Sequence, residues 1–541
     1  METANSVGRH KRRLAMSSYY VESHHPYGVK PEGNAFLASV DLLNVRLNGL
    51  GRLKCLNDEV LLEILSYFNG PEIVKLIYTS KTLYVYCHYT DIWRDIMLRE
   101  WENNAQSYPI KYCYTWKDTY VSSYCERNNI AKPKIPHQPL IVDGIYSNLL
   151  YRSWACHECN YEKSCQGFWT NDDVPHIEAD KLTIEEFIAN YETQNRPVVI
   201  KNCINDWSAL RTWTKDYLTS QCGDNKFRAT SSTAPIAASF TMEEYFSYAH
   251  QSKEEVPYYL FERNYDNMAK ALKSDYYVPR YFNAEDYNNQ HHATDLFSLF
   301  GSRRPDYKWL IIGPKKSGSI FHIDPNQTNA WNAAIKGRKK WIFYPPGRNP
   351  PGVLTSADLG DVTVPLSTGE WLLSFWKYHL EARNDINPMN RPLETILHPG
   401  EVIFVPHSWW HCVINLDDSI ALTHNYVSTS NLSDCLHFLR EKTDQISGVR
   451  DRNTIDNTVQ PDEMYPLFIQ ELKSNTTINK SILDDAIARS YQSANDNKNT
   501  TDAREPSNDF NKRKRKLLDK PLKDNVKSAV DDEPFVFNFD F

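Results

Sequence analysis

Residues 303–346 read RRPDYKWLIIGPKKSGSIFHIDPNQTNAWNAAIKGRKKWIFYPP, and this stretch carries the most information about the fold. Three apolar runs of strand length, separated by Gly and Pro, lie at residues 309–312, 320–324 and 340–344. In the middle run, His322 and Asp324 are two residues apart. Because side chains alternate along a strand, both point to one face, where an imidazole and a carboxylate make half of a metal site.

A third metal ligand must come from elsewhere in the chain. Three later histidines are open as this ligand: His407, His411 and His424. His411 begins a predicted strand directly after the sequence PHSWW. Two histidines and one carboxylate form the facial triad of non-haem iron(II) oxygenases, which leaves positions open for cosubstrate and dioxygen. A lone H-x-D pair is common by chance, so spacing alone decides neither the metal site nor its third ligand.

The surrounding sequence predicts a β-rich domain. Further apolar runs of strand length lie at residues 197–200, 401–405, 411–416 and 420–427, and a helical pattern at 183–191 precedes them. Many strands with helices mainly at the start favour a barrel or sandwich over alternating strands and helices. We see no internal repeat.

Composition narrows the class of protein. The 541 residues allow two to four domains, at roughly 100–200 residues each. The net charge of −7 gives no global argument for nucleic-acid binding. We find no apolar run long enough for a membrane span and no secretory signal at the N-terminus. Eleven scattered cysteines are not typical of a disulfide framework, so we expect a reducing, intracellular environment.

We expect five segments along the chain: a disordered N-terminal segment (1–48), a small helical module (49–100), a linker region (101–172), the β-rich domain (173–450) and a largely disordered tail (451–541). In the helical module, Leu61, Ile64, Leu65 and Phe68 follow the spacing of an amphipathic helix. A module of this size needs a partner or neighbour to bury its apolar faces. Much of the tail is rich in Asn, Asp, Thr and Ser, which is typical of disorder.

The β-rich domain resembles the Jumonji-C oxygenases, most of all a nuclear subgroup of lysyl hydroxylases and arginine demethylases. Matching stretches follow in order: TIEEFIANYETQNRPVVIKN (183–202), YYLFERNYD (258–266), YYVPRYF (276–282), residues 303–346 and PGEVIFVPHSWWHCVINLDDSIALTHNY (399–426). The resemblance implies a double-stranded β-helix, a cupin-like jelly roll with flanking helices. It also implies iron(II) as the metal and 2-oxoglutarate as cosubstrate, with His322, Asp324 and His411 as the ligands.

The same resemblance implies a pocket for 2-oxoglutarate. Lys339 falls where the family places the lysine that binds the distal carboxylate of the cosubstrate. The other positions implied are Ser319, Tyr259, Asn332 and Thr423. Asn425 follows Thr423 on the same strand face. For Tyr259, Asn332 and Asn425, a packing or turn role explains the residue equally well.

The implied reaction is an oxidative decarboxylation of 2-oxoglutarate, to succinate and carbon dioxide, coupled to hydroxylation of a protein side chain. Hydroxylation of an N-methyl group leads to formaldehyde and the demethylated amine. The expected substrate is therefore a lysyl side chain, or a methylated arginine or lysine, in a histone or another nuclear protein. The sequence chooses neither hydroxylation nor demethylation.

Within residues 51–98, the sequence LKCLNDEVLLEILSYFNGPEIVKLIYTSKTLYVYCHYTDIWRDIM resembles an F-box, with Leu56-Asn57 in place of the usual Leu-Pro. An F-box docks a Skp-type adaptor of cullin ubiquitin ligases. The alternative is a helical cap on the catalytic domain. A rival function follows, that of a substrate adaptor whose β-rich domain binds a target without turnover. A complete triad together with Lys339 favours the enzyme.

Two weaker patterns remain. Cys156 and Cys159, with Cys165 nearby, have a spacing seen in zinc sites, but no second such pair follows, and we expect free thiols in a loop. Basic runs at residues 9–13 and 512–516 are candidate nuclear localisation signals, with a solvated basic run as the alternative. We therefore expect the protein in the nucleus, with the cytoplasm as a second location.

Overall fold

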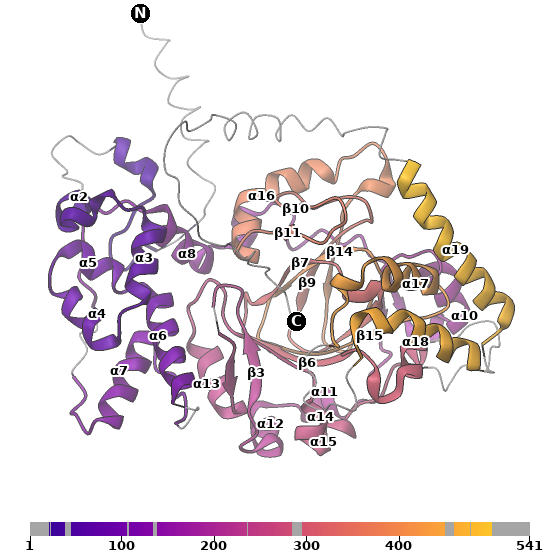
Figure 1. Ribbon diagram of the computed structural model, residues 1–541. Coiled ribbons are helices and arrows are strands. Elements are labelled where there is room, and N and C mark those ends of the chain that lie inside the picture. Colours follow the sequence, from indigo (N-terminus) through magenta and orange to yellow (C-terminus); the bar gives the residue numbers. More distant parts are fainter. Residues whose placement is uncertain are drawn as a thin grey trace, which may run out of the picture. The chain divides into compact units, whose positions relative to one another are not determined.

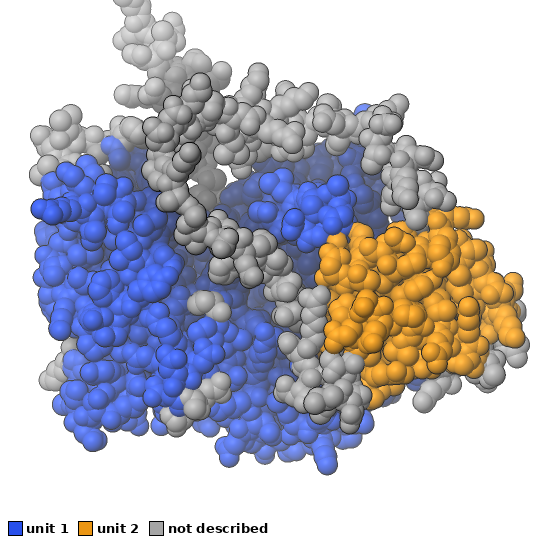
Figure 2. Space-filling view, in the orientation of Figure 1, with its two compact units in different colours: residues 1–286, 307–324, 328–426 blue, residues 287–306, 325–327, 427–541 orange. Residues whose placement is uncertain are grey.

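The computed structural model describes residues 21, 23–37, 45–104, 108–133, 138–234, 236–283, 295–449, 459–475 and 478–499. The chain forms two compact units (Figure 1, Figure 2). Unit 1 comprises residues 1–286, 307–324 and 328–426, and unit 2 comprises residues 287–306, 325–327 and 427–541. Throughout the described ranges, every helix is too short or too polar to span a bilayer.

Unit 1 is built around two facing β-sheets (Figure 1). The smaller sheet has the order β12-β9-β14-β7, formed by Leu393–Leu397, Lys339–Tyr344, Trp410–Asn415 and Gly318–His322. The larger sheet has the order β1-β2-β13-β8-β15-β6-β5-β3-β4, formed by His176–Glu178, Val198–Lys201, Val402–Val405, Asn329–Lys336, Ser419–Tyr426, Lys308–Gly313, Tyr259–Glu262, Phe227–Thr230 and Ala238–Phe240. A separate short ribbon pairs β10 and β11, at Leu354–Thr355 and Val362–Thr363.

The connectivity is that of a double-stranded β-helix. From β6 to β15 the chain passes between the sheets: β6, β8, β13 and β15 lie in the larger sheet, and β7, β9, β12 and β14 in the smaller one. All pairs among these eight strands are antiparallel. Such a jelly roll confirms the predicted fold class.

Strand β9 is covered by apolar side chains on both of its faces. Trp341 and Phe343 pack with Val413 inside the roll, whereas Ile342 and Tyr344 pack in a second cluster on the opposite face. Helix α16 (Thr368–Ala382) supplies residues to that second cluster. Because both faces are covered, all six residues of β9 are buried, including its two lysines.

The predicted strands are confirmed to within two residues at each end, but other strands were not predicted, among them β12 of the smaller sheet and the central strand β8 of the larger one. β8 lies between β13 and β15, and seven of its eight residues are buried. Its sequence NAWNAAIK contains Asn and Ala, which have low strand propensity. Tertiary burial, rather than local preference, therefore makes this segment a strand.

The helices of unit 1 lie at the N-terminal end and around the sheets. They are α2 (Val45–Gly49), α3 (Asp58–Ser66), α4 (Gly70–Ile77), α5 (Lys81–Tyr86), α6 (Thr90–Asn103), α7 (Trp116–Arg127), α8 (Asn148–Glu158), α9 (Tyr161–Ser164), α10 (Ile184–Phe187), α11 (Ala209–Thr212), α12 (Lys215–Cys222), α13 (Met242–Gln251), α14 (Tyr265–Met268), α15 (Lys270–Lys273) and α16. Side chains of Asn57, Asn69 and Ser80 cap α3, α4 and α5 by accepting backbone hydrogen bonds.

The predicted helical module is present, and it shares its core with the β-rich part of unit 1. Leu61 of α3 and Leu422 of β15 belong to one continuous buried apolar cluster. Arg94 of α6 is fully buried and donates a hydrogen bond to the Thr233 carbonyl, with Glu254 3.4 Å from its guanidinium. The region predicted as a linker contains α7, α8 and α9, so much of it is helical rather than irregular.

Unit 2 consists mainly of α17 (Leu432–Glu441), α18 (Pro461–Ser474) and α19 (Lys480–Asn499), with a 3-10 helix at Leu296–Arg303. Met464 and Phe468 of α18 are buried with Leu436 of α17 and Leu483 of α19. The prediction of a largely disordered tail from residue 451 was therefore wrong for residues 461–474 and 480–499. A few apolar residues at helical spacing are enough to form a core in this segment, because the helices of unit 2 pack on one another. Both basic runs lie outside the described residues.

Candidate active site

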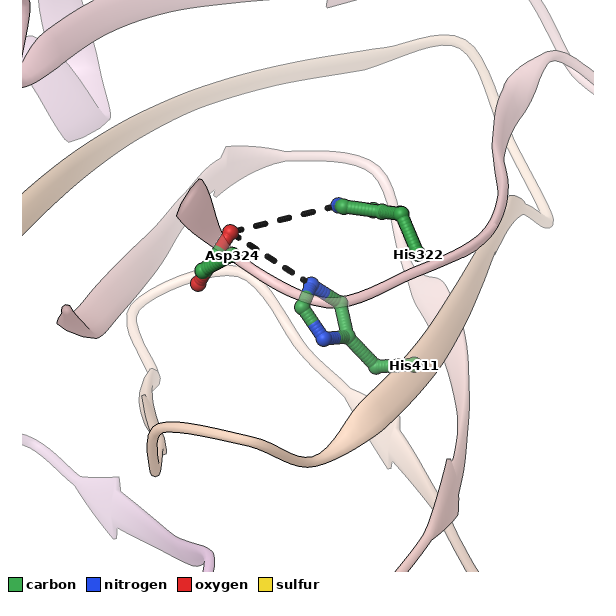
Figure 3. Close-up of side chains that lie close together, drawn as sticks. All are labelled: His322, Asp324 and His411. Carbon is green, nitrogen blue, oxygen red and sulfur yellow. Dashed lines mark ion pairs between the residues drawn. The ribbon is translucent and has the colours of Figure 1, made fainter. Parts of the chain in front are cut away.

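The three predicted ligands His322, Asp324 and His411 lie together, with their side chains converging on one point (Figure 3). Their ligand atoms are all within 4.8 Å of one another. Nε2 of His322 lies 4.0 Å and Nε2 of His411 lies 3.9 Å from Oδ1 of Asp324. Over the ranges that the structure describes, this is the only group of three or more side chains suited to hold a metal ion.

Strand pairing brings the two histidines together. His322 ends β7 and is paired directly with His411 of β14, with ring centroids 4.2 Å apart. The prediction that Asp324 lies on the same strand as His322 was wrong, because β7 ends at His322. Asp324 follows beyond the strand end, and its carboxylate turns back toward the two imidazoles.

Neither rival histidine joins this group. His424 lies on the outer side of β15, with its ring centroid 4.3 Å from that of Trp331. The backbone N–H of His407 donates to Oδ1 of Asn329 over 2.9 Å. Of the three histidines left open by the sequence, the fold brings only His411 to His322 and Asp324.

Backbone contacts orient both imidazoles. Nδ1 of His322 lies 2.8 Å from the Ile320 carbonyl, and Nδ1 of His411 lies 3.1 Å from the Trp409 carbonyl. A carbonyl oxygen can only accept, so Nδ1 carries the proton in each ring. Nε2, which faces Asp324, then carries the lone pair in each neutral ring, which is the usual arrangement of histidine ligands.

The electrostatics of the group also fit a cation. Burial raises the pKa of Asp324, although His322 and a hydrogen bond from Asn425 oppose this effect. Burial and the neighbouring His322 lower the pKa of His411 well below its usual value. Among the described residues, no lysine or arginine forms an ion pair with Asp324. A largely enclosed carboxylate, 15% exposed, with two imidazoles and no lysine or arginine beside it among the described residues is suited to a divalent ion.

Lys339 is a second buried charge without a charged partner. It is 1% exposed, on β9. Its ammonium donates to Oδ1 of Asn415 at 2.7 Å, to the Tyr259 hydroxyl at 3.1 Å and to the Ser419 hydroxyl at 3.4 Å. Each partner is neutral, and no carboxylate pairs with Lys339 in the described part of the chain. A buried ammonium in this setting fits an anionic ligand such as a carboxylate.

Two of these partners, Asn415 and Ser419, were not predicted. Asn415 lies four residues after His411 on β14, so alternation alone puts both on one face of the strand. That signal was present in the sequence. Ser419 begins β15, and nothing local distinguishes it from other serines. Behind Asn415, its amide donates to the Ser317 hydroxyl over 2.8 Å.

The remaining predicted pocket residues face the inside of the roll in different ways. Ser319 pairs with Val413, because the register shifts by one residue between His411 and Val413. This bulge turns Ser319 to the same side as the metal ligands despite its odd spacing from His322. Thr423 donates its hydroxyl proton to the Trp331 carbonyl at 2.9 Å.

The buried polar atoms that lack a hydrogen-bond partner within the described residues include two on the inner face of the roll, the Asn332 side-chain oxygen and the Trp341 indole nitrogen. Asn332 pairs with Thr423 across β8 and β15, and Trp341 stacks on His411 with ring centroids 5.8 Å apart. Buried polar groups are nearly always satisfied, so this part of the roll fits a polar occupant. With Lys339 and the triad, the interior fits 2-oxoglutarate and a metal ion.

The cysteine pattern does not form a zinc site in the described structure. Cys156, Cys159 and Cys165 form no disulfide bond within the described residues and are buried in an apolar cluster. Burial raises the pKa of Cys156 and of Cys165, which disfavours the thiolates that zinc needs. Cys156 lies on α8 rather than in the predicted loop.

Comparison with known proteins agrees with this site. Residues 184–431 match the cupin-like domain family. The chain is 36% identical to the "Arginine-specific demethylase JMJ22" of Arabidopsis thaliana over 452 residues, 83% of each chain. It is 33% identical to the "Lysine-specific demethylase JMJ21" of the same plant over 393 residues, 71% of this chain and 38% of that protein. It is 31% identical to the "Bifunctional arginine demethylase and lysyl-hydroxylase psr-1" of Caenorhabditis elegans over 270 residues, 48% and 63% of the two chains.

Two findings together identify the family of this chain. The jelly roll holds a clustered His-Asp-His group and a buried lysine, and one relative matches over most of both chains. This chain belongs to the cupin-like, Jumonji-C family of iron(II)- and 2-oxoglutarate-dependent oxygenases.

Proposed function

We propose that His322, Asp324 and His411 hold iron(II) and that Lys339 binds the distal carboxylate of 2-oxoglutarate. The observation that supports this most is that one roll holds a buried lysine and a carboxylate only 15% exposed, neither of which is paired with an opposite charge of a lysine, arginine or carboxylate among the described residues. Asp324 lacks a lysine or arginine partner among the described residues, and the ammonium of Lys339 contacts only neutral oxygens. A cation bound at Asp324 and an anion bound at Lys339 would each supply the missing opposite charge and remove the cost of burying an unpaired one.

The chain's own residues would orient these groups. The Nδ1 protons of His322 and His411, held by backbone carbonyls, keep Nε2 available for the metal. Asn425 hydrogen-bonds to Asp324 and keeps its carboxylate in place. When bound, iron(II) supplies the dioxygen chemistry that couples decarboxylation of 2-oxoglutarate to oxidation of a substrate C–H bond.

We propose that the substrate is a cationic side chain of a nuclear protein, such as a histone. Methylated arginine is the first choice, because the relative that matches 83% of both chains is named an arginine-specific demethylase. Lysyl hydroxylation is the alternative, since the Caenorhabditis elegans relative is named for both activities.

The test is turnover on two matched peptides, one with dimethylarginine and one with unmodified lysine. Iron(II), 2-oxoglutarate and the full chain are incubated with each, and succinate, formaldehyde and peptide mass are measured. Formaldehyde with loss of a methyl group supports demethylation, and a gain of one oxygen on lysine supports hydroxylation. His322→Ala should abolish either reaction, whereas His250→Ala, on an exposed helix end, serves as the matched control. Absence of both products would refute the proposal.

We propose a second, binding role for the F-box-like helices. Val60, Ile64 and Tyr67 lie on one face of α3 and its end, at the spacing of a helical stripe, and are 44%, 37% and 76% exposed. Exposed apolar stripes of this kind are typical of helix-mediated docking. A Skp-type adaptor of a cullin ubiquitin ligase is the proposed partner.

Substitutions on the stripe test this role. Leu61 is unsuitable, because it is fully buried and a charge there would disrupt the core. Tyr67→Lys should abolish co-purification of a Skp-type adaptor with the full chain, whereas Tyr114→Lys, at a tyrosine 74% exposed elsewhere, should not. Absence of any complex with the unaltered chain would contradict the docking proposal and leave the oxygenase proposal untouched.

We also propose that the protein acts in the nucleus. The basic runs at residues 9–13 and 512–516 support this location. Replacing the basic residues of both runs by Gln in a fluorescent fusion should shift the protein to the cytoplasm. Unchanged nuclear fluorescence would contradict the role of these runs.

A further inference from the structure

A buried cluster of polar and charged side chains lies on the outer face of the smaller sheet, behind the proposed cosubstrate site. We call it the Glu394 cluster, and it comprises Glu394, Lys340, His379, Arg383 and Tyr344. Glu394 of β12 and Lys340 of β9 have fully buried side chains, and Nζ lies 2.9 Å from Oε2. The Lys340 ammonium, which has three N–H donors, also donates a hydrogen bond to the Asn171 carbonyl at 2.9 Å.

Glu394 is the centre of this cluster. Its Oε1 accepts hydrogen bonds from Arg383 Nη1 at 2.9 Å, from His379 Nε2 at 3.0 Å and from the Asn171 amide at 2.7 Å. Burial alone raises the pKa of Glu394, but the bonds and charges of His379 and Lys340 outweigh it, so the pKa lies below its usual value. The carboxylate is therefore ionised and holds three segments of the chain together.

Strand β9 is held by this cluster at two points. Near its start, Lys340 pairs with Glu394. At its end, the Tyr344 hydroxyl lies 2.8 Å from Nδ1 of His379. Because Nε2 of that ring donates to a carboxylate, Nδ1 accepts, and the tyrosine is the donor. Both anchors lie on the outer face of β9. Between them, Trp341 and Phe343 point to the inside of the roll.

The inner face of β9 carries the site. Lys339 directly precedes Lys340, and Phe343, which directly precedes Tyr344, pairs with His411 of β14. We propose that the Glu394 cluster is a positioning centre for the cosubstrate site, which holds β9 from behind and thereby keeps the Lys339 ammonium beside Tyr259. This inference rests on the proposed role of Lys339 as the anchor for 2-oxoglutarate.

The physical reason is the cost of a buried charge. If Glu394 loses its charge, the ammonium of Lys340 stays buried without a counter-ion, which is strongly unfavourable. The strand relieves this cost by moving Lys340 toward water, and the adjoining Lys339 moves with the backbone. Residues that orient a binding group from behind typically affect affinity by tenfold or more. Glu394 thus acts through Lys339 and is a positioning residue.

The chain offers a matched control on the other side of Lys339. Arg338 forms an ion pair with Asp417 over 2.7 Å, and both side chains are 41% exposed. Asp417→Asn makes the same chemical change as Glu394→Gln, next to a cation that also adjoins Lys339. Water can replace the lost contact there, so Asp417→Asn should leave 2-oxoglutarate affinity unchanged.

The experiment titrates 2-oxoglutarate into the full chain loaded with iron(II) under argon. The charge-transfer absorption of the iron–2-oxoglutarate chelate reports binding without turnover. Glu394→Gln should raise the Kd for 2-oxoglutarate about tenfold, with iron affinity unchanged. All titrations are made well below the melting temperature of each variant, so that a loss of stability alone does not move the Kd. If Glu394→Gln does not fold, Lys340→Met takes its place. It removes the ion pair that holds β9 to Glu394, while Glu394 keeps its bonds to His379 and Arg383, so the Kd for 2-oxoglutarate should rise because β9 has lost this anchor.

The outcomes separate this inference from the assignment on which it rests. A raised Kd in Glu394→Gln and Lys339→Met, but not in Asp417→Asn, supports both. A raised Kd in Lys339→Met alone refutes the positioning role and leaves the anchor in place. An unchanged Kd in Lys339→Met refutes the anchor itself. An equal rise in Asp417→Asn also refutes the positioning role, because any charge change near Lys339 would then suffice.

Discussion

Replacing Lys339 by Met should stabilise the protein without ligands and weaken the binding of 2-oxoglutarate. The ammonium is buried and contacts three neutral oxygens at 2.7, 3.1 and 3.4 Å. An unpaired buried ion costs several kcal/mol, and hydrogen bonds of a charged group return about 1.5–3 kcal/mol each at good geometry, so the two shorter contacts and the weak third one at 3.4 Å offset only part of this cost. Met keeps most of the side-chain volume, so the net gain in unfolding free energy is about 1 kcal/mol or more.

The effect on the cosubstrate has the opposite sign. A hydrogen bond to a charged group contributes about 1.5–3 kcal/mol, and every 1.4 kcal/mol is a factor of ten. Loss of the ammonium should therefore raise the Kd for 2-oxoglutarate about 10- to 100-fold. A functional group that lowers stability while it serves binding is a common feature of active sites.

Thermal melting of the metal-free chain and anaerobic titration of the iron-loaded chain measure the two effects. Lys336→Met is the matched control, because that lysine, on the neighbouring strand β8, donates to the Leu210 carbonyl at 2.8 Å and has no proposed role in the site. The melting temperature should rise by about 2 °C or more in Lys339→Met. A lower melting temperature together with an unchanged Kd would refute the reasoning.

Three further predictions concern stability. Arg94→Met should lower the unfolding free energy by about 3–5 kcal/mol in urea, because buried carboxylates lose their counter-ion; a loss below about 1 kcal/mol would contradict this. Gly318 has φ of +153°, and a Cβ there would lie 1.9 Å from the Val413 carbonyl oxygen. Gly318→Ala should therefore break the β7–β14 pairing and lower the unfolding free energy by about 2 kcal/mol or more. It should also reduce the amount of bound iron. A folded variant with full iron content would show that the strands adapt. Burial and the charge of Lys117 lower the pKa of His88 from 6.5 to about 4, so its contribution to stability is complete above pH 6.5 and is lost as pH falls toward 4. His88→Gln should therefore flatten the acid loss of stability over this range, and an identical pH profile would count against it.

The sequence predicted the jelly roll well where its strands are rich in β-branched and aromatic residues. Strand β9, with KKWIFY, and β15 are examples. It did not predict β8, whose Asn and Ala residues have low strand propensity, because burial between two neighbouring strands decides that segment. The helices of unit 2 were missed for a related reason. α19 has a polar composition, and only its contacts with α17 and α18 give it a core.

The candidate site divides in the same way. Lys339 and Lys340 make contacts on different sides of β9, as strand alternation requires, and the same rule applied to β14 would have found Asn415. The contact between Lys339 and Ser419 could not be predicted, because Ser419 comes from another strand, β15. In the Glu394 cluster, Glu394 contacts Asn171 and Lys340, which are far from it in the sequence. No local sequence pattern therefore reveals the cluster.

The sequence by itself determined the chemistry that is available: an H-x-D pair, later histidines and a lysine within the basic run RKK at residues 338–340, in an order that resembles one family. Only the tertiary structure decided which histidine completes the group. Periodicity acts along one strand, whereas His411 meets His322 through the register between two strands. The tertiary structure also decided that Lys339 is buried and Asp324 only 15% exposed, with no carboxylate beside the first and no lysine or arginine beside the second in the described chain, and this removal from water is what makes those charges need ligands.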